Sequence, residues 1–346
     1  MPRWIPVSIL IIAVLGLVYL IGPSGDTPRL QAAQFAPPSD LRMLEASIAG
    51  REAANPAVKP GNAACFAWAD SLRPARTRYA ILYLHGFSAS HEEGAALARA
   101  AARTYGCNLF LARLHAHGLD RPEPMLELDA DSLFYTAQEA LAIARQLGDS
   151  VILMGTSTGG TLSLALAARH PDLAGMVLLS PNIRIFDPNA ALLTAPWGLQ
   201  LARVIKGSPY NAWEADAYEQ QFWTTRYRLE AVRELQALVE ETMKPEAFAS
   251  IRQPVFLGYY FRDEVHQDST VSVPAMLEMF GQLGTPDALK RKVAFPDAGA
   301  HVIGNPRTSK AYAAVEAETL RFMAEVLRLR PVPAAAPAAP EPVTAP

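Results

Sequence analysis

The amino-acid sequence predicts an α/β fold in which a mostly parallel central sheet has helices on both faces and a helical cap. Two observations support this prediction. Short apolar segments alternate with longer segments of helical periodicity from Tyr79 to Ser180, and the alternation returns from Pro254 to Leu329. Between Pro181 and Pro254 it stops, and only helical and turn patterns occur. A helical insertion between two sheet strands is typical of a cap over the strand ends.

In the N-terminal half, the short apolar segments predict strands and the helical segments predict the connections between them. Because strand and helix alternate, successive strands are expected to lie parallel in one sheet. Active sites of such folds lie at the carboxyl ends of the strands. The expected strands are 65–69, 79–84, 108–114, 151–154 and 176–180, and the expected helices are 95–102, 133–147 and 161–169.

The cap is expected at residues 184–252 and contains a predicted helix over 227–243. Its aromatic residues predict an apolar inner surface, and Phe222 and Trp223 are the candidates for contact with a substrate. Packing inside the cap is the alternative explanation for them. The aromatic residues are Tyr210, Trp213, Tyr218, Phe222, Trp223 and Tyr227. After the cap, the expected elements are strand 255–261, helix 273–283, strand 292–295 and helix 309–329.

Composition sets the domain organisation and excludes one class of function. The 346 residues are 50% apolar and 19% charged, which is ordinary for a globular protein, and the folded domain is expected at 61–330. Residues 26–60 are interpreted as a linker and lead-in with one short helix over 41–48, and the Pro/Ala-rich residues 331–346 as a disordered tail. The net charge of −3, without any Lys/Arg-rich run, argues against nucleic-acid binding.

Residues 1–25 are interpreted as a transmembrane anchor. No charged residue occurs from Trp4 to Gly25, and the segment is almost wholly aliphatic from Ile5 to Ile21. The alternative, a cleaved signal peptide, usually has a shorter apolar core and a small-x-small cleavage site, which is not evident here. Because Arg3 precedes the apolar segment, the rest of the chain is expected on the extracytoplasmic (periplasmic) side, or secreted on that side if the segment is cleaved.

The candidate nucleophile is Ser157, in the sequence Gly155-Thr156-Ser157-Thr158-Gly159. A buried strand precedes this sequence and an Ala/Leu-rich helix follows it, which is the context of a nucleophile elbow. The sharp turn strains the backbone of the serine and brings neighbouring chain close, so the two flanking positions require glycine. A Gly/Ser/Thr connector without chemistry is the alternative. A phosphate-binding loop lacks its lysine here.

A serine hydroxyl needs a base within hydrogen-bond reach and an acid that orients the base. His301 follows the last predicted strand and is therefore expected at the same edge of the sheet as Ser157. For the acid, Asp268 is favoured because apolar residues and a helix follow it, while Asp263 is the second choice because it is nearer the end of strand 255–261. Of the other histidines, His91 and His170 are expected at the surface, and His115 and His117 in a loop where they bond to the backbone.

The remaining part of the chemistry is an oxyanion hole, which needs two backbone N–H groups. Thr158 is expected to supply one and Phe87 the other, because Gly86 allows its loop to approach the elbow closely. His85 is expected to shape this loop and has no assigned chemical role. No cluster of His, Asp or Glu has the spacing of metal ligands, so neither a metal nor another cofactor is predicted. Cys65 and Cys107 are interpreted as buried thiols, with a single disulfide as the alternative.

These residues resemble the alpha/beta hydrolase superfamily over residues 64–329. The order nucleophile, acid and base, as Ser157, Asp268 and His301, matches that of the family. His85-Gly86-Phe87 matches its oxyanion-loop motif, and Arg113 to Gly118 looks like its loop ending in His-Gly. The cap position is similar to that of the lipase, esterase and serine-aminopeptidase-like branch, which includes monoacylglycerol lipases. The resemblance implies a serine hydrolase and disfavours dehalogenase or epoxide-hydrolase chemistry, because those relatives use aspartate as nucleophile.

The predicted function is therefore a serine hydrolase that cleaves carboxylic esters, with lipid or acyl-glycerol esters as the narrower hypothesis, through an acyl-serine intermediate. The predicted partners are a small-molecule ester or lipid and, through the N-terminal helix, a membrane. Peptide hydrolysis, thioester hydrolysis and acyl transfer are alternatives that use the same triad. A non-catalytic binding protein with this fold is the more distant alternative.

Overall fold

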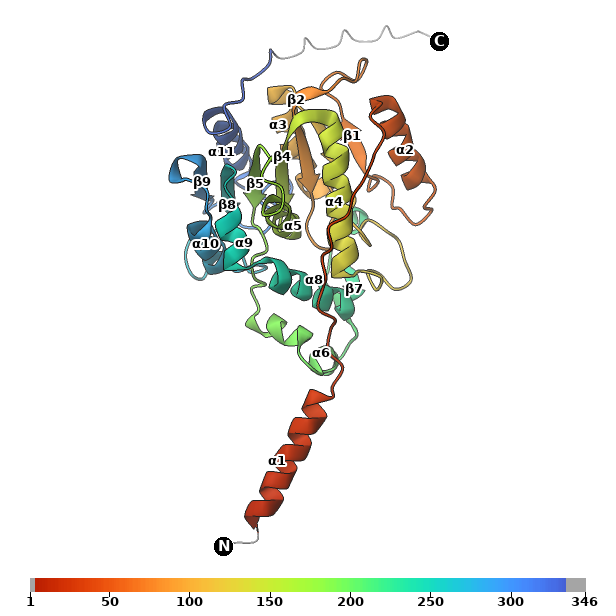
Figure 1. Ribbon diagram of the computed structural model, residues 1–346, viewed down its shortest axis with the longest axis vertical. Helices are drawn as coiled ribbons and strands as arrows, with labels where there is room; N and C mark the ends of the chain where they lie inside the picture. The colour runs from red at the N-terminus through yellow and green to blue at the C-terminus, as the bar shows by residue number, and fades with distance from the viewer. Residues whose placement is uncertain (1–3, 334–346) are drawn as a thin grey trace.

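The computed structural model describes residues 4–333 and contains a central seven-stranded sheet (Figure 1). Its strand order is β1-β3-β2-β4-β5-β8-β9, and every neighbouring pair is parallel except β1 with β3. The predicted mostly parallel α/β sheet is therefore confirmed. The strands are β1 (Cys65–Ala67), β2 (Thr77–Leu84), β3 (Asn108–Leu111), β4 (Gly148–Thr156), β5 (Gly175–Leu179), β8 (Val255–Tyr259) and β9 (Lys290–Ala294).

Helices cover both faces of the sheet because its strands are apolar on both sides. In β2, Leu82 and Leu84 belong to one buried cluster, whereas Ile81 and Tyr83 belong to the other. This alternation follows from the two-residue period of a strand. One face is covered by α3 (Glu92–Tyr105) and α11 (Tyr312–Glu325). The other face is covered by α2 (Leu41–Ala53), α4 (Ala130–Leu147), α5 (Thr158–Ala167) and α10 (Val273–Gln282).

Part of the segment interpreted as a linker belongs to this packing. Helix α2 begins at the expected Leu41 but continues to Ala53. Asp40 caps it, because its carboxylate accepts the backbone N–H of Met43 at 2.8 Å. Leu44 and Ile48 are buried in the same cluster as the strands. The lead-in is thus anchored on the sheet by the apolar side of α2.

The stretch between β5 and β8 forms the helical insertion that the sequence indicated. It also contains a β-hairpin that the sequence did not indicate. Strands β6 (Tyr210–Ala212) and β7 (Arg226–Arg228) pair antiparallel. In the loop after β2, the carbonyl of Ser88 accepts the N–H of Thr224 at 2.7 Å. The insertion therefore contacts the loop after β2 directly. Its helices are η1 (Pro188–Thr194), α6 (Gly198–Lys206), α7 (Ala217–Phe222), α8 (Leu229–Thr242) and α9 (Pro245–Ser250).

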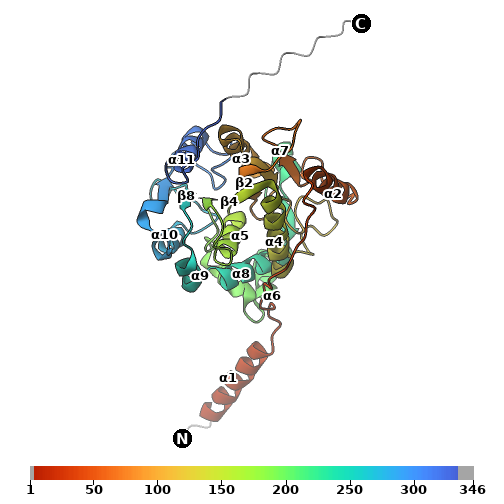
Figure 2. The ribbon, with the colours of Figure 1, turned by 45° about the horizontal axis from the view of Figure 1, so that its top comes forward.

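Helix α1 (Trp4–Leu20) projects away from the rest of the fold (Figures 1 and 2). Its last turn meets the insertion at Trp197, whose indole N–H donates to the carbonyl of Val18 at 2.9 Å. Within residues 4–333, no helix is long and apolar enough to cross a membrane, so the predicted transmembrane helix finds no support there. Of the predicted Pro/Ala-rich tail, residues 334–346 lie outside the described residues.

Candidate active site

Ser157 lies in the sharp turn between β4 and α5, with φ 53° and ψ −117°. These angles are strained for a residue with a side chain, as expected of a nucleophile elbow. A Cβ atom at Gly159 would lie 1.8 Å from the carbonyl oxygen of Leu84, and one at Gly155 would lie 2.4 Å from that of Gly159. The requirement for glycine on both sides of the serine is therefore steric, for the reason that the sequence indicated.

The backbone of Ser157 is held by the strand beside it. Its N–H donates to the carbonyl of Leu179 at 3.0 Å, and its carbonyl accepts the N–H of Asn182 at 3.0 Å. These bonds connect the turn to the carboxyl end of β5. The strained turn is thus fixed by the neighbouring elements. The side chain of Ser157 lies in a nearly closed site, because the residue is only 7% exposed.

His301 and Asp268 come from loops after neighbouring strands and are in direct contact. His301 Nδ1 donates to Asp268 Oδ2 at 2.6 Å. The other carboxylate oxygen, Oδ1, accepts the backbone N–H groups of Thr270 at 2.9 Å and Val271 at 3.1 Å. Asp268 is 1% exposed. Both of its oxygens are therefore satisfied inside the protein, one by the histidine and one by the backbone.

The electrostatics of this pair favour its charged forms. Burial by itself raises the pKa of Asp268, but the His301 ring and the two backbone N–H groups outweigh burial and lower it. For His301, burial lowers the pKa, whereas the carboxylate of Asp268, and that of Glu93 when it is ionised, raise it, and the net change is upward. An imidazole with these neighbours is a stronger base than an isolated one.

The second candidate acid, Asp263, contacts a different histidine. Its Oδ1 lies 3.0 Å from His266 Nδ1. The side chain of Asp263 is 51% exposed, and hydrogen bonds from the backbone and ring of His266 lower its pKa. The structure thus brings Asp268, and not Asp263, to His301. In the described part of the chain Ser157 makes no hydrogen bond to His301, so their contact stays a prediction.

The loop after β2 lies against the elbow, as the glycine at position 86 indicated. A Cβ atom on Gly86 would lie 3.1 Å from Ser157 Cβ. Within residues 4–333, the backbone N–H groups of Phe87 and Thr158 donate to no other group. Thr158 is the first residue of α5, where backbone N–H groups have no partner inside the helix. Both N–H groups are therefore available, and their role in an oxyanion hole stays a prediction.

Two buried histidines form the floor of this loop. His85 Nδ1 donates to the carbonyl of Gly86 at 2.9 Å, and its Nε2 accepts the N–H of Leu114 at 3.1 Å. The ring of His117 packs edge-on against it, with centroids 5.0 Å apart. Burial and the neighbouring His117 hold the pKa of His85 well below its ordinary value. His85 is thus a neutral ring with both nitrogens engaged, which agrees with a shaping role.

Glu93, a residue that no sequence pattern marked, is 2% exposed and lies in the first turn of α3. Its carboxyl accepts the N–H of Gly86 and lies 3.3 Å from the hydroxyl of Tyr83. Burial raises the pKa of Glu93 to about 8. From sequence alone, an acid in the first turn of a helix is explained by the helix dipole, so no signal marked it as buried.

One histidine prediction was wrong. His91 was expected at the surface but is 4% exposed, because its ring packs against the chain at the start of β1, with Nε2 4.0 Å from Cys65 Sγ. Its Nε2 lies 3.0 Å from the carbonyl of Ala63. Burial lowers the pKa of His91 to about 4. His115 and His117 do bond to backbone carbonyls, of Glu127 at 2.9 Å and of His115 at 2.6 Å respectively.

The cap aromatics divide into two groups. Phe222 and Trp223 pack around Tyr218, with ring centroids 4.9 and 6.1 Å away. The ring of Phe222 also faces Gly61, just after the lead-in, and lies 3.2 Å from its Cβ position. Its contact with substrate stays a prediction. Tyr227 instead packs edge-on against Phe87 of the oxyanion loop at 5.0 Å. Tyr227 is thus a cap aromatic whose ring contacts the loop after β2.

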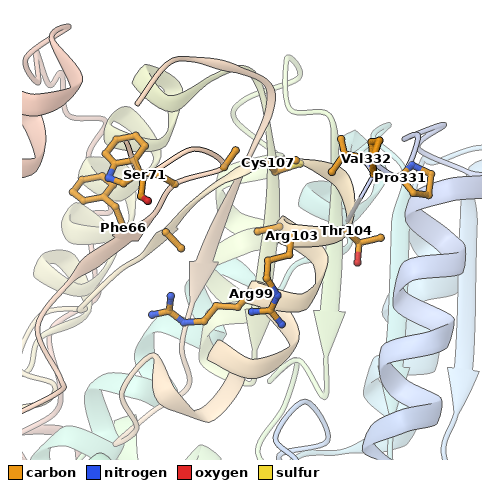
Figure 3. Close-up of a pocket in the computed structure, with 14 residues that line it drawn as sticks. Phe66, Ser71, Arg99, Arg103, Thr104, Cys107, Pro331 and Val332 are labelled. Atoms are coloured by element: carbon orange, nitrogen blue, oxygen red, sulfur yellow. The ribbon is translucent and has the colours of Figure 1, made fainter. Parts of the chain in front are cut away.

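One sizeable cavity lies away from these residues. It has a volume of about 840 Å³ and is lined by α3, β1 and residues 331–333, with Phe66, Arg99 and Cys107 among its walls (Figure 3). Neither Ser157 nor His301 lines it. Cys107 is buried and Cys65 partly buried, and both are free thiols. Residues 4–333 contain no group of three or more His, Cys, Asp or Glu side chains that could hold a metal ion.

Comparison with known proteins adds a family to this geometry. The sequence model of the alpha/beta hydrolase family matches residues 81–318. A thermostable monoacylglycerol lipase from a Bacillus species is 31% identical over 105 residues, which are 30% of this chain and 41% of that enzyme. The chain thus matches less than half the length of this curated relative.

Solved structures show the same fold at low identity. A metagenome-derived lipolytic enzyme superposes with a TM-score of 0.59 and 18% identity, covering 77% of this chain and 98% of that one. A soluble variant of monoglyceride lipase from Saccharomyces cerevisiae, in complex with a substrate analogue, has a TM-score of 0.55 and 14% identity, covering 86% and 96%. Identities this low show a shared fold and leave the substrate open.

Proposed function

The chain belongs to the alpha/beta hydrolase family, and we propose that it is a serine hydrolase that cleaves carboxylic esters through an acyl-serine intermediate. The similarity to lipases and esterases agrees with the branch that the sequence resembles. One observation supports the proposal above all others. At the carboxyl edge of the sheet, a strained serine turn after β4 has two free N–H groups near it, and the loops after β8 and β9 carry a buried, hydrogen-bonded Asp-His pair. This is the set of groups that acyl transfer requires.

In the proposed reaction, Ser157 Oγ attacks the ester carbonyl while His301 Nε2 takes its proton. Asp268 holds His301 Nδ1–H, so the unprotonated nitrogen faces the serine, and its charge stabilises the imidazolium that forms. The N–H groups of Phe87 and Thr158 receive the negative oxygen of the tetrahedral intermediate. His301 then gives the proton to the leaving alcohol, and water repeats the sequence on the acyl-enzyme.

The proposed substrates are lipid esters, with acyl-glycerols as the narrower class. Two observations support this choice. The relative that covers part of the chain is a monoacylglycerol lipase. The side of the cap facing the oxyanion loop is aromatic, with Tyr227 against Phe87 and Trp213 behind it at 5.8 Å. An apolar wall beside the nucleophile suits an acyl chain.

The test combines turnover and active-site labelling of the full chain in mild detergent. We expect release of product from p-nitrophenyl esters and monoacylglycerols, and covalent labelling by a fluorophosphonate probe. Ser157→Ala abolishes both, whereas Ser132→Ala, at a partly exposed serine of α4, changes neither. A wild-type protein that neither turns over esters nor forms the adduct contradicts the proposal and favours the non-catalytic alternative. A panel of peptides, thioesters and alcohol acceptors separates hydrolysis of esters from the alternatives that use the same triad.

The proposed location is a membrane surface, with α1 as the attachment and the catalytic domain on the extracytoplasmic side. Helix α1 carries exposed apolar side chains, including Leu10 at 65% and Ile12 at 69%. Where α1 meets the cap, Val204 and Ile205 of α6 are each 77% exposed, beside Arg203 and Lys206 in its last turn. An apolar helix side flanked by basic residues is typical of binding to a lipid interface.

This location has its own experiment. We expect the full chain to float with anionic liposomes, and a variant carrying Val204→Glu and Ile205→Glu to float less. A C-terminal alkaline phosphatase fusion, which is active only outside the cytoplasm of a bacterial host, tests the side of the membrane. An inactive fusion, or a chain that stays with the soluble fraction, contradicts the proposed location and leaves the proposed chemistry untouched.

A further inference from the structure

A buried carboxyl group that the mechanism above does not use lies directly behind the oxyanion loop. Glu93 of α3 accepts the backbone N–H of Gly86. A Cβ atom on Gly86 would lie 3.2 Å from both Glu93 carboxyl oxygens and 3.1 Å from Ser157 Cβ. The carboxyl group and the nucleophile are thus separated by little more than the space of one methyl group. No other side chain bonds to the N–H of Gly86 within residues 4–333.

Within residues 4–333, no Lys, Arg or His side chain forms an ion pair with Glu93. Tyr83 of β2 lies 3.3 Å away through its hydroxyl, which also bonds to Thr156 at 2.9 Å. His301 faces it from the loop after β9, and its charge favours the ionised form. Glu92, on the same turn of α3, is a further acid. A carboxyl group buried without an ion-pair partner is more stable in its neutral form.

We propose that Glu93 is a positioning residue whose neutral form holds Gly86, and thereby the Phe87 N–H, in the oxyanion hole, and whose ionisation lowers the activity of the site. The inference rests on the proposed function, because it assumes an oxyanion at this place. It goes beyond that function because it assigns a role to a protonated acid, Glu93, outside the Ser-His-Asp triad.

The position of Glu93 explains why its neutral form suits the reaction. The carbonyl oxygen of a protonated carboxyl group still accepts the Gly86 N–H, so the loop stays fixed. An ionised carboxylate places a negative charge beside the oxyanion that forms in the transition state, which is unfavourable where water is excluded. It also favours a protonated His301, which cannot take the serine proton. Burial, which raises the pKa of Glu93 to about 8, keeps the acid neutral at neutral pH.

The loop that carries His301 is fixed to the same turn of α3. The side-chain amide of Asn305 donates to the carbonyl of Glu92 at 3.2 Å. A Cβ atom on Gly304 would lie 3.5 Å from Leu97 Cδ2, on the next turn of α3. The first turns of α3 therefore support both the oxyanion loop, through Glu93, and the base loop, through Asn305.

The experiment compares Glu93→Gln, Glu93→Ala and Glu92→Gln in the full chain. We expect the wild-type kcat/KM to fall above about pH 8. Glu93→Gln keeps a neutral acceptor for the Gly86 N–H, so it retains kcat at neutral pH to within about fivefold and lacks the alkaline decline. Glu93→Ala loses roughly tenfold or more in kcat, with KM little changed, because the interaction acts on the transition state. Glu92→Gln, the matched loss of charge one residue away, keeps both kcat and the alkaline decline.

Two outcomes overturn the inference. The first is a decline of kcat/KM at alkaline pH that persists unchanged in Glu93→Gln. The second is a loss of kcat in Glu93→Gln as large as in Glu93→Ala, which means that the charge of Glu93 is needed. If the variants do not fold, difference infrared spectroscopy of the wild-type protein decides. A protonated carboxyl band at neutral pH that disappears on alkaline titration supports the inference, and its absence contradicts it. This band does not depend on ester turnover, so failure of the proposed function is distinguished from failure of the role of Glu93.

Discussion

Replacement of Asp268 by asparagine should reverse the tautomer of His301, for a reason visible in the hydrogen bonds of the carboxylate. Oδ1 accepts two backbone N–H groups, from Thr270 and Val271. In Asp268→Asn these donors require the amide oxygen at the same place, so the amide NH₂ must face His301 Nδ1. That nitrogen then becomes an acceptor, and the proton moves to Nε2. A histidine protonated at Nε2 cannot take the proton of Ser157.

The expected loss is large, because the change removes the base and not only a charge. A wrong tautomer in a Ser-His-Asp triad costs roughly 10⁴-fold in kcat, or about 5 kcal/mol of transition-state stabilisation. The side chain keeps its size and its two backbone hydrogen bonds, so we expect a much smaller effect on the melting temperature. The assay is kcat and KM for a p-nitrophenyl ester at neutral pH, together with the rate of fluorophosphonate labelling. Labelling should slow in parallel with kcat, because both need an activated Ser157.

Asp263→Asn is the matched control. Its carboxylate is half exposed and bonds to His266, so its replacement should change kcat by less than about twofold. If Asp263→Asn abolishes turnover while Asp268→Asn retains it, the acid has been assigned to the wrong residue. If Asp268→Asn labels at the wild-type rate, the tautomer argument fails even where turnover is reduced.

Three further predictions follow from single contacts. Gly86→Ala should lower kcat roughly tenfold with little change in thermal stability, because its Cβ would lie within 3.1–3.2 Å of Ser157 and Glu93; a wild-type kcat contradicts the close approach. The acid-side midpoint of the kcat/KM profile should lie above the ordinary histidine pKa, because the pKa of His301 is raised and its protonation at lower pH removes the base. A midpoint that moves to higher pH in Asp268→Asn contradicts this. The free energy of unfolding, measured with denaturant, should fall as pH is lowered from 6.5 to 4, because His91 stays neutral in the fold down to about pH 4 whereas the unfolded chain binds a proton near 6.5. The loss is at most about 3 kcal/mol. If His91→Gln shows the same dependence of stability on pH, the prediction is refuted.

The parts of the fold that the sequence predicts are those determined by local patterns. The elbow is one example, because strand, Gly-x-Ser-x-Gly and helix are contiguous in the chain, and the close contacts of Gly155 are with Gly159 and Gly160 of the same turn. The apolar strands are another, since β2 is buried on both faces and therefore has no polar alternation. The strand limits are predicted less accurately. Strand β4 extends from Gly148 to Thr156 although only Val151 to Met154 are apolar, because pairing with β2 continues along its polar start.

Features that depend on distant partners were not predictable. The hairpin of Tyr210 with Arg228 has three residues in each strand, too few to show a period. The choice between Asp268 and Asp263 could only be weighed, since both follow the same strand. The structure separates them because His266 lies three residues after Asp263 and binds it locally, whereas Asp268 is carried inward by Val271 and Val273, which are 1% exposed.

The oxyanion loop shows why a catalytic loop can be short and still be held in place. His85 bonds to its carbonyl from within the loop, Glu93 holds its N–H from α3, and Thr224 of the cap bonds to Ser88 at its end. The loop itself, the helix that follows it and the cap therefore hold the turn, while the N–H of Phe87 is left free. Because the donors of an oxyanion hole act only if they need no reorganisation during the reaction, the cap should contribute to kcat as well as to substrate affinity. A cap that moved with substrate would release Ser88 and, with it, one of the three supports of Phe87.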